Sequence, residues 1–302
     1  MADLEARMKG SEFVASLPES YSKDGDIRDS MILQAIAEGN VRPITWSPVH
    51  LEMPGHSGTA WVMSDALGVG DADDWVRINA SQTMEQEIAD MLGLRLLTAK
   101  LADEIHKQAG IVIRPAIDPV NLAADDKMAD TSRMLLHHQK VQEKLSNDYH
   151  LTDLISTVGK DWIITNQIAG FPNKGANYGW HDRLAKTLSE GGLPLWQQVG
   201  LAHNRFHADY SQVVRLVSPD VMVDDQWMTY EDVLTSPELS PLLSYEGPMK
   251  ITRSPGVAPI GAVFRASPEP SELEQAKKAN WLLIGMGAVA LLGAAMFVRA
   301  KP

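Results

Sequence analysis

Histidines and an aspartate are concentrated in one stretch of the chain. The stretch reads NYGWHDRLAKTLSEGGLPLWQQVGLAHNRFHADYSQVVRLV and contains His181, His203, His207 and Asp209. Imidazole and carboxylate groups bind catalytic zinc, and the same groups transfer protons in hydrolases that use no metal. The stretch is therefore the candidate site, and its residue types leave both kinds of chemistry open.

One interpretation of this stretch is a zinc site. Catalytic zinc is typically held by three protein ligands and one water molecule, whose pKa the metal lowers. We expect His181, His203 and Asp209 to be the three ligands. Zinc is accordingly the cofactor to test for.

The conformation of residues 203–207 decides which side chains lie close enough to bind one metal ion. If residues 203–207 are helical, His203 and His207 share one face at the spacing of zincins, but Asn204 stands where those enzymes have a glutamate base. If the segment is a strand, His207 and Asp209 are neighbours on one face and His203 lies farther away. The two conformations predict different ligand sets.

A metal-free interpretation uses the same stretch. Asp209 would orient a histidine that acts as general base, with Ser211 or Tyr210 as nucleophile or proton donor. The expected catalytic set is then His181, His203, Asp209, Tyr210 and Ser211. The alternative without a reaction is a hydrogen-bond network that holds a long loop, and the sequence leaves it open.

The elements DWIITN, NYGWH and HNRFHADYSQVVRLV resemble a pattern of uncharacterised bacterial and phage proteins. In that pattern a Tyr-Gly-Trp-His element precedes a histidine and an Asp-Tyr-Ser element, and the resemblance covers roughly residues 40–250. It singles out the five residues just named but implies no reaction. A looser likeness is to zinc D-alanyl-D-alanine carboxypeptidases and endopeptidases, which cut cell-wall peptides. His203 and Asp209 are closer together than in that group, and Trp180-His181 comes before them instead of after.

The elements that must position these residues are a mixture of helices and strands. Apolar periodicity predicts helices over 27–38 and 84–92, the second started by a capping box at Thr83, and Thr98 is expected to cap a further helix. KDWIITNQI and QVVRLV are predicted to be core strands on either side of the candidate site. Because helices and strands follow no regular βαβ alternation, we expect an α+β fold.

Composition limits the kinds of partner. The chain has 302 residues, a formal net charge of -12 and no run of five basic residues, so it offers no source for phosphate-backbone binding and no nucleic-acid partner is expected. It contains no cysteine, which excludes thiolate nucleophiles and cysteine zinc sites.

The C-terminal part predicts a membrane anchor. Residues 281–298, WLLIGMGAVALLGAAMFV, are 18 residues without a charge, and as a helix they would span about 27 Å, enough to cross a bilayer. Basic residues flank the segment on both sides, and its glycines and alanines would allow two such helices to pair in a homo-oligomer. The lipid bilayer is therefore the first expected partner.

The chain is thus predicted to have four parts. Residues 1–24 form an N-terminal segment without an apolar export signal, 25–253 a globular α+β domain, 254–280 a linker with several prolines, and 281–298 a single transmembrane helix. A tail-anchored protein without an export signal has its body in the cytoplasm, unless the protein is released or carried by a virion.

Three functions fit these observations. The first is a membrane-anchored hydrolase, zinc-dependent or not, that acts on cell-wall peptides. The second is a non-enzymatic membrane-anchored structural or assembly protein, of a phage or virion for example. The third is a ligand-binding or sensing domain. A bound metal would favour the first function, and partner binding without turnover would favour the second.

Overall fold

The longest strands of the chain form a five-stranded antiparallel sheet in the computed structural model, which describes residues 7–117, 127–145, 149–263 and 266. The strand order is β1-β2-β12-β13, with β5 paired to β12. The bounds are β1 Trp46–Met53, β2 His56–Met63, β5 Arg95–Leu96, β12 Leu216–Val223 and β13 Gln226–Thr229. Pro54 and Gly55 form the turn between β1 and β2, where Gly55 has a φ of 89° that favours glycine.

A second sheet carries the candidate site. It has four antiparallel strands in the order β10-β11-β9-β8, with bounds β8 Lys160–Trp162, β9 Asn177–His181, β10 Thr187–Leu188 and β11 Pro194–Gly200. The other strands that the structure describes form two small sheets: β3 Gly68–Gly70 pairs with β4 Trp75–Arg77, and β6 Ile111–Val112 pairs in parallel with β7 Ile155–Ser156.

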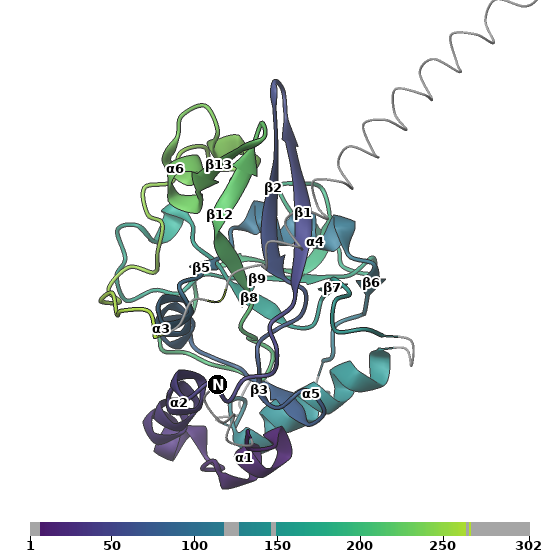
Figure 1. Cartoon of the computed structure of the whole chain (residues 1–302), viewed down its shortest axis with the longest axis vertical. Helices are drawn as coiled ribbons and strands as arrows, with labels where there is room; N and C mark the ends of the chain where they lie inside the picture. The colour runs from purple at the N-terminus through teal and green to yellow at the C-terminus, as the bar shows by residue number, and fades with distance from the viewer. Residues whose placement is uncertain (1–6, 118–126, 146–148, 264–265, 267–302) are drawn as a thin grey trace, which may run out of the picture. The chain divides into compact units, whose positions relative to one another are not determined.

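Helices cover the sheets and close one end of the body. Their bounds are α1 Gly10–Ser16, α2 Tyr21–Ala37, α3 Gln82–Leu92, α4 Ala99–Gln108, α5 Thr131–Lys144 and α6 Tyr230–Thr235, with 3₁₀ turns η2 Asn166–Ile168 and η3 Ser240–Leu242. In Figure 1, α1, α2 and α5 lie at one end and the β1–β2 hairpin extends at the other. Helix α4 contacts β1, β7 and β9, so it links the two larger sheets. The described part is a mixed α+β domain, as the sequence predicts.

The helix ends show which sequence signals decide boundaries. The Thr98 hydroxyl accepts from the backbone N–H of Leu101 and caps α4, as predicted. Helix α3 begins earlier than predicted, because the Ser81 hydroxyl accepts from the N–H of Met84. Thr83 is inside that helix, and its hydroxyl donates to the carbonyl of Arg205 instead. The capping box at Thr83 was therefore wrong, although the helix itself is confirmed.

The predicted strands near the site have other bounds in the structure. β8 ends at Trp162 and is shorter than predicted, whereas β12 begins only at Leu216 but continues to Val223. Residues 210–211 form a turn, and Gln212 and Val213 make isolated bridges instead of a continuous ladder. Helices α1 and α2 both begin before residue 25. The linker 254–280 lies only partly within the described residues, and the anchor 281–298 lies outside them. Of the helices that the structure describes, none is long and apolar enough to cross a membrane.

Candidate functional site

The predicted site residues fall into two groups. His181 ends strand β9. The other four lie in the irregular segment 201–215: His203, Asp209, Tyr210 and Ser211. Residues 203–207 are neither the helix nor the strand considered above, because bends, one turn and a single bridge at Asn204 take their place.

The two groups lie on opposite faces of the β8–β9 ladder. Asp161 on β8 is directly opposite Tyr178 on β9, and directly opposed residues share a face of a sheet. The hydroxyl of Tyr178 reaches Asp103 on α4. Lys160 precedes Asp161 and points to the other face, where its Nζ atom lies 2.8 Å from Oδ2 of Asp209. The two groups are therefore separate sites.

The first site, here called the Asp103 cluster, is built around a fully buried carboxylate. Its Oδ1 atom accepts from the Tyr178 hydroxyl at 2.7 Å and lies 2.7 Å from Nε2 of His181, and its Oδ2 atom accepts from the Tyr245 hydroxyl at 2.8 Å. A carboxylate only accepts, so the Nε2 atom of His181 carries a proton. The members of the cluster are Asp103, His106, Ser156, Tyr178, His181 and Tyr245.

A second histidine of this cluster bonds a serine. The rings of His106 and His181 are stacked, with centroids 4.5 Å apart and planes at 15°. The Nδ1 atom of His106 lies 2.8 Å from Oγ of Ser156, which in turn lies 3.1 Å from Oγ1 of Thr157. A hydroxyl within hydrogen-bond distance of an imidazole is the arrangement of a nucleophile with its general base.

Burial and hydrogen bonding set the charges in the Asp103 cluster. Burial alone would raise the pKa of Asp103, but hydrogen bonds from His181, Tyr178 and further hydroxyls outweigh it and lower that pKa. Burial, followed by the proximity of His181, lowers the pKa of His106 to about 4. Burial and the Asp103 carboxylate raise the pKa of Tyr178 and of Tyr245. At neutral pH the aspartate is ionised, His106 is neutral and both tyrosines keep their protons.

Strained backbone surrounds the cluster. Thr157 has a φ of 70° and Trp180 a φ of 56°, a region that β-branched and bulky residues rarely adopt and that costs on the order of 1–3 kcal/mol. Together with Gly179, at a φ of 118°, Trp180 breaks the strand alternation. As a result Tyr178 and His181, which would face opposite sides of a regular strand, both reach α4.

A loop closes over the same cluster. A Cβ atom at Gly191 would overlap the hydroxyl oxygen of Tyr245 and lie 2.6 Å from Oδ2 of Asp103, so only glycine fits there. Ser156 and His181 are also buried, at 2% and 4% exposure. His106 and Tyr245 are the half-buried members of the cluster, so solvent reaches the cluster at these two side chains.

The second site, here called the Asp209 cluster, holds a buried ion pair. Besides the Lys160 ammonium, Asp209 binds the backbone N–H and the hydroxyl of Ser211, at 2.7 Å and 2.5 Å. The Nζ atom of Lys160 lies 5.1 Å from the Trp180 ring centre. The members of the cluster are Lys160, Trp180, His203, His207, Asp209 and Ser211.

Two stacked histidines lie beside this ion pair. The rings of His203 and His207 are 3.8 Å apart and nearly parallel, and Nε2 of His207 is buried without a hydrogen-bond partner. Burial, followed by the charge of Lys160, lowers the pKa of His203, and burial with His203 lowers the pKa of His207 to about 4. Tyr210 is buried nearby, where its ring packs on His137 at 5.5 Å.

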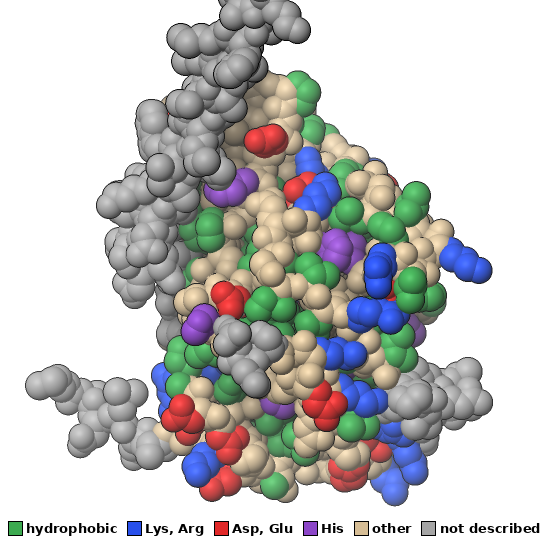
Figure 2. Space-filling model, turned by 90° about the vertical axis from the view of Figure 1, so that its right-hand side faces the viewer, with side chains coloured by type: hydrophobic (Ala, Val, Ile, Leu, Met, Phe, Trp, Pro, Cys, Tyr) green, Lys and Arg blue, Asp and Glu red, His purple; other side chains and the backbone are tan. Residues whose placement is uncertain are grey.

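The predicted zinc ligands do not meet. Within residues 7–117, 127–145 and 149–263, no three His, Asp or Glu side chains are grouped so that they could hold a metal ion. His181 is bonded to Asp103 on one face of the sheet, and Asp209 is bonded to Lys160 and Ser211 on the other. On the face shown in Figure 2, histidines also reach the surface at separate places. The ligand set His181, His203 and Asp209 is therefore not assembled in this structure.

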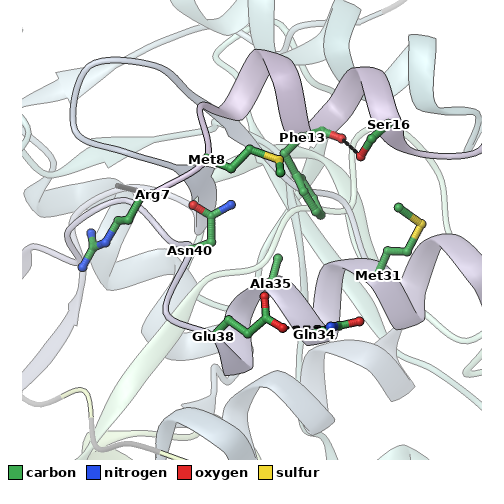
Figure 3. A pocket seen from close by; sticks show the side chains of 9 residues that line it. All are labelled: Arg7, Met8, Phe13, Ser16, Met31, Gln34, Ala35, Glu38 and Asn40. Atoms are coloured by element: carbon green, nitrogen blue, oxygen red, sulfur yellow. Dashed lines mark hydrogen bonds between the residues drawn. The ribbon is translucent and has the colours of Figure 1, made fainter. Parts of the chain in front are cut away.

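A hollow of about 340 Å³ lies elsewhere, between α1 and α2. In Figure 3 Met8 and Phe13 project into it, and the Gln34 and Glu38 side chains bond each other along its rim. All of its lining residues lie between positions 7 and 40, and none belongs to either cluster. It therefore adds nothing to the chemistry of the two sites.

The sequence stretch did not reveal most of the Asp103 cluster. Asp103 and His106 are three residues apart on α4, an ordinary polar spacing on a helix, and Ser156 ends the two-residue strand β7. Their partner His181 is 78 residues from Asp103 along the chain. The only available signal was Thr98, which fixes the start of α4 and hence the face on which both residues lie.

Comparison with known proteins finds no matching family model, no matching curated protein and no matching solved structure.

Proposed function

We propose that this chain is a membrane-anchored hydrolase whose reaction takes place at the Asp103 cluster. The observation that carries the proposal is the 2.8 Å distance between Oγ of Ser156 and Nδ1 of His106. His106 is stacked on His181, which the Asp103 carboxylate binds at 2.7 Å. A nucleophile, its base and a group that holds the base in place are the three parts of nucleophilic catalysis. The uncharged segment 281–298 supports the anchoring.

The geometry supports acyl transfer. Neutral His106 accepts the proton of Ser156 as its oxygen attacks the substrate carbonyl, and protonated His106 then donates that proton to the leaving group. Water, activated by the same imidazole, releases the acyl group from the serine. Asp103 binds the Nε2 proton of His181 and so fixes the ring against which His106 packs. The likeness to enzymes that cut cell-wall peptides makes peptide amides the first substrate class to test.

A fluorophosphonate probe tests this function without knowledge of the substrate. It reacts with activated serine hydroxyls, and we expect the full-length chain to be phosphonylated at Ser156, as mapped by peptide mass spectrometry. Because a general base contributes at least about 100-fold, His106→Ala should slow labelling by that factor or more. The exposed residues Ser57 and His150 provide matched controls, and Ser57→Ala and His150→Ala should label as the wild type does.

Digestion of purified cell-wall peptides tests the substrate class. New amino groups, read by mass spectrometry, should form with the wild type and not with Ser156→Ala. A probe that leaves Ser156 unmodified, or labels it equally well in His106→Ala, would overturn the hydrolase proposal.

A non-enzymatic structural protein is the second candidate. The observation in its favour is burial, because a substrate must reach a serine that is only 2% exposed. In that case the Asp103 cluster only joins α4 to the β9 strand. Unlabelled Ser156 in a correctly folded chain would favour this second function.

A further inference from the structure

A buried guanidinium with two unpaired nitrogen atoms lies immediately before β12. Arg215 is 3% exposed, and its Nε and Nη2 atoms are buried with no partner among the described residues. Its backbone N–H donates to Oε1 of Glu85 at 3.1 Å. A buried, unpaired charge is costly, and such groups in folded proteins usually bond a counter-ion, water or a ligand.

The nearby acidic groups do not supply this partner. Asp65 is the counter-ion of two other guanidiniums, at 2.5 Å from Arg77 and 3.3 Å from Arg42. Burial raises the pKa of Glu85 well above its ordinary value, which disfavours its charged form, and its Oε1 atom accepts from the backbone N–H of Arg215 instead of from the guanidinium. Asp161 attracts Arg215 electrostatically but makes no hydrogen bond to it in the described structure. Among the described residues, none of these three carboxyl groups accepts a hydrogen bond from Nε or Nη2 of Arg215.

The two free donors have a specific geometry. Nε and Nη2 form one edge of the planar guanidinium, and their parallel N–H bonds match the two oxygens of a carboxylate. A lysine at this position would present a point charge without that fork. The free edge therefore favours a planar anion over a spherical one.

We propose that the Nε–Nη2 edge of Arg215 binds a carboxylate group of a ligand. Asp161 lies near enough to both Arg215 and His181 for their charges to lower its pKa, although burial raises that pKa overall to about 6. It also shares a sheet face with Tyr178. The inference that this carboxylate belongs to the substrate rests on the proposed function. The inference that Arg215 binds a carboxylate does not.

Two ligand pairs test the inference on the full-length chain. Acetate is compared with acetamide, which has the same shape without the charge, and N-acetylglycine is compared with its amide. Binding is followed by the ¹⁵Nε–H NMR signal of Arg215, assigned by its loss in Arg215→Lys, and by thermal unfolding. We expect both acids to shift the signal and raise the unfolding temperature, and neither amide to do so. N-acetylglycine binding more tightly than acetate identifies a peptide C-terminus, and the reverse identifies a small free acid.

Two variants separate a ligand site from a structural arginine. Arg215→Lys should weaken acid binding by about tenfold, because the fork is lost, whereas Arg114→Lys on the surface should not change it. Asp161→Asn should strengthen binding, because it removes a negative charge that competes for Arg215. Equal binding of acids and amides, or unchanged affinity in Asp161→Asn, would overturn the inference even if Arg215→Lys failed to fold. Acid binding by a chain whose Ser156 is unreactive would retain this inference and reject the hydrolase.

Discussion

At the scale of single residues, Asp103 is the group on which the site depends. Its two oxygens bind one imidazole and two phenol hydroxyls, and it is fully buried. Such a carboxylate is favourable only while its donors remain, since each hydrogen bond to a charge offsets part of the cost of burying it. The three hydrogen bonds from Tyr178, His181 and Tyr245 therefore stabilise the fold. The bond between Asp103 and His181 also keeps the His181 ring in position.

Asp103→Asn should lower the free energy of unfolding by about 3 kcal/mol at pH 7, because the amide nitrogen faces a donor where the wild type has an acceptor. Urea denaturation followed by circular dichroism measures this change. Asp220→Asn, the same substitution at an exposed position of β12, should change stability by less than about 0.5 kcal/mol. Equal effects of the two substitutions would show that Asp103 does not hold the cluster together.

At the scale of elements, sequence signals predicted what is local and missed what depends on distant partners. Thr98 fixes the start of α4, and Gly93, with a φ of 68°, ends α3. Both signals act within one helical turn, and both the cap at Thr98 and a helix end at residue 92 were predicted. Residues 203–207 form neither a helix nor a strand, because their conformation depends on bonds such as that between Gly175 N–H and the His203 carbonyl, 28 residues apart. No local pattern encodes such a contact.

The same limit applies to the candidate site. The stretch that includes His181 and Asp209 was considered as a long loop, but it supplies strands β9, β10 and β11 of the second sheet. Alternation along it could not show that the two residues face opposite sides of that sheet. The break in alternation arises from the positive φ of Trp180. Bulky aromatic residues rarely adopt a positive φ, so nothing in the sequence indicated this break. His181 bonds a carboxylate, but that carboxylate belongs to Asp103, which lies outside the stretch.

The segment between β7 and β8 stores part of the strain. Thr157→Gly should leave the free energy of unfolding unchanged or raise it by up to about 1 kcal/mol, because relief of the left-handed φ offsets the flexibility that glycine adds. Thr187→Gly in the extended strand β10 is the matched control and should cost about 1 kcal/mol. A Thr157→Gly variant destabilised as much as Thr187→Gly would show that Thr157 carries no strain.

At the scale of the whole molecule, buried titratable groups couple stability to pH. His137 and His138 on α5 are buried, and burial together with the Arg77 guanidinium lowers the pKa of each to about 3. In the unfolded chain both titrate near about 6.5. As pH falls below about 6.5, the two histidines bind protons in the unfolded chain but not in the folded chain. The free energy of unfolding therefore decreases progressively as pH falls below that value. Glu85 acts in the opposite direction, since burial raises its pKa and the folded chain binds its proton first as pH falls.

Because these effects oppose each other, the pH dependence of wild-type stability does not show which residue causes which effect. A variant that lacks one titrating group separates them. His138→Gln keeps an acceptor for the backbone N–H of Arg77, which His138 Nδ1 accepts at 3.1 Å, but removes the titration. Relative to the wild type, this variant should gain about 1.4 kcal/mol in free energy of unfolding for each pH unit lowered between about pH 6 and 4. Urea unfolding at pH 7, 6, 5 and 4 measures the difference, and His150→Gln, at an exposed histidine, should run parallel to the wild type. A His138→Gln curve parallel to that of the wild type would mean that His138 has the same pKa in the folded and unfolded chains. That result would contradict a pKa lowered by burial and by the two nearby guanidiniums.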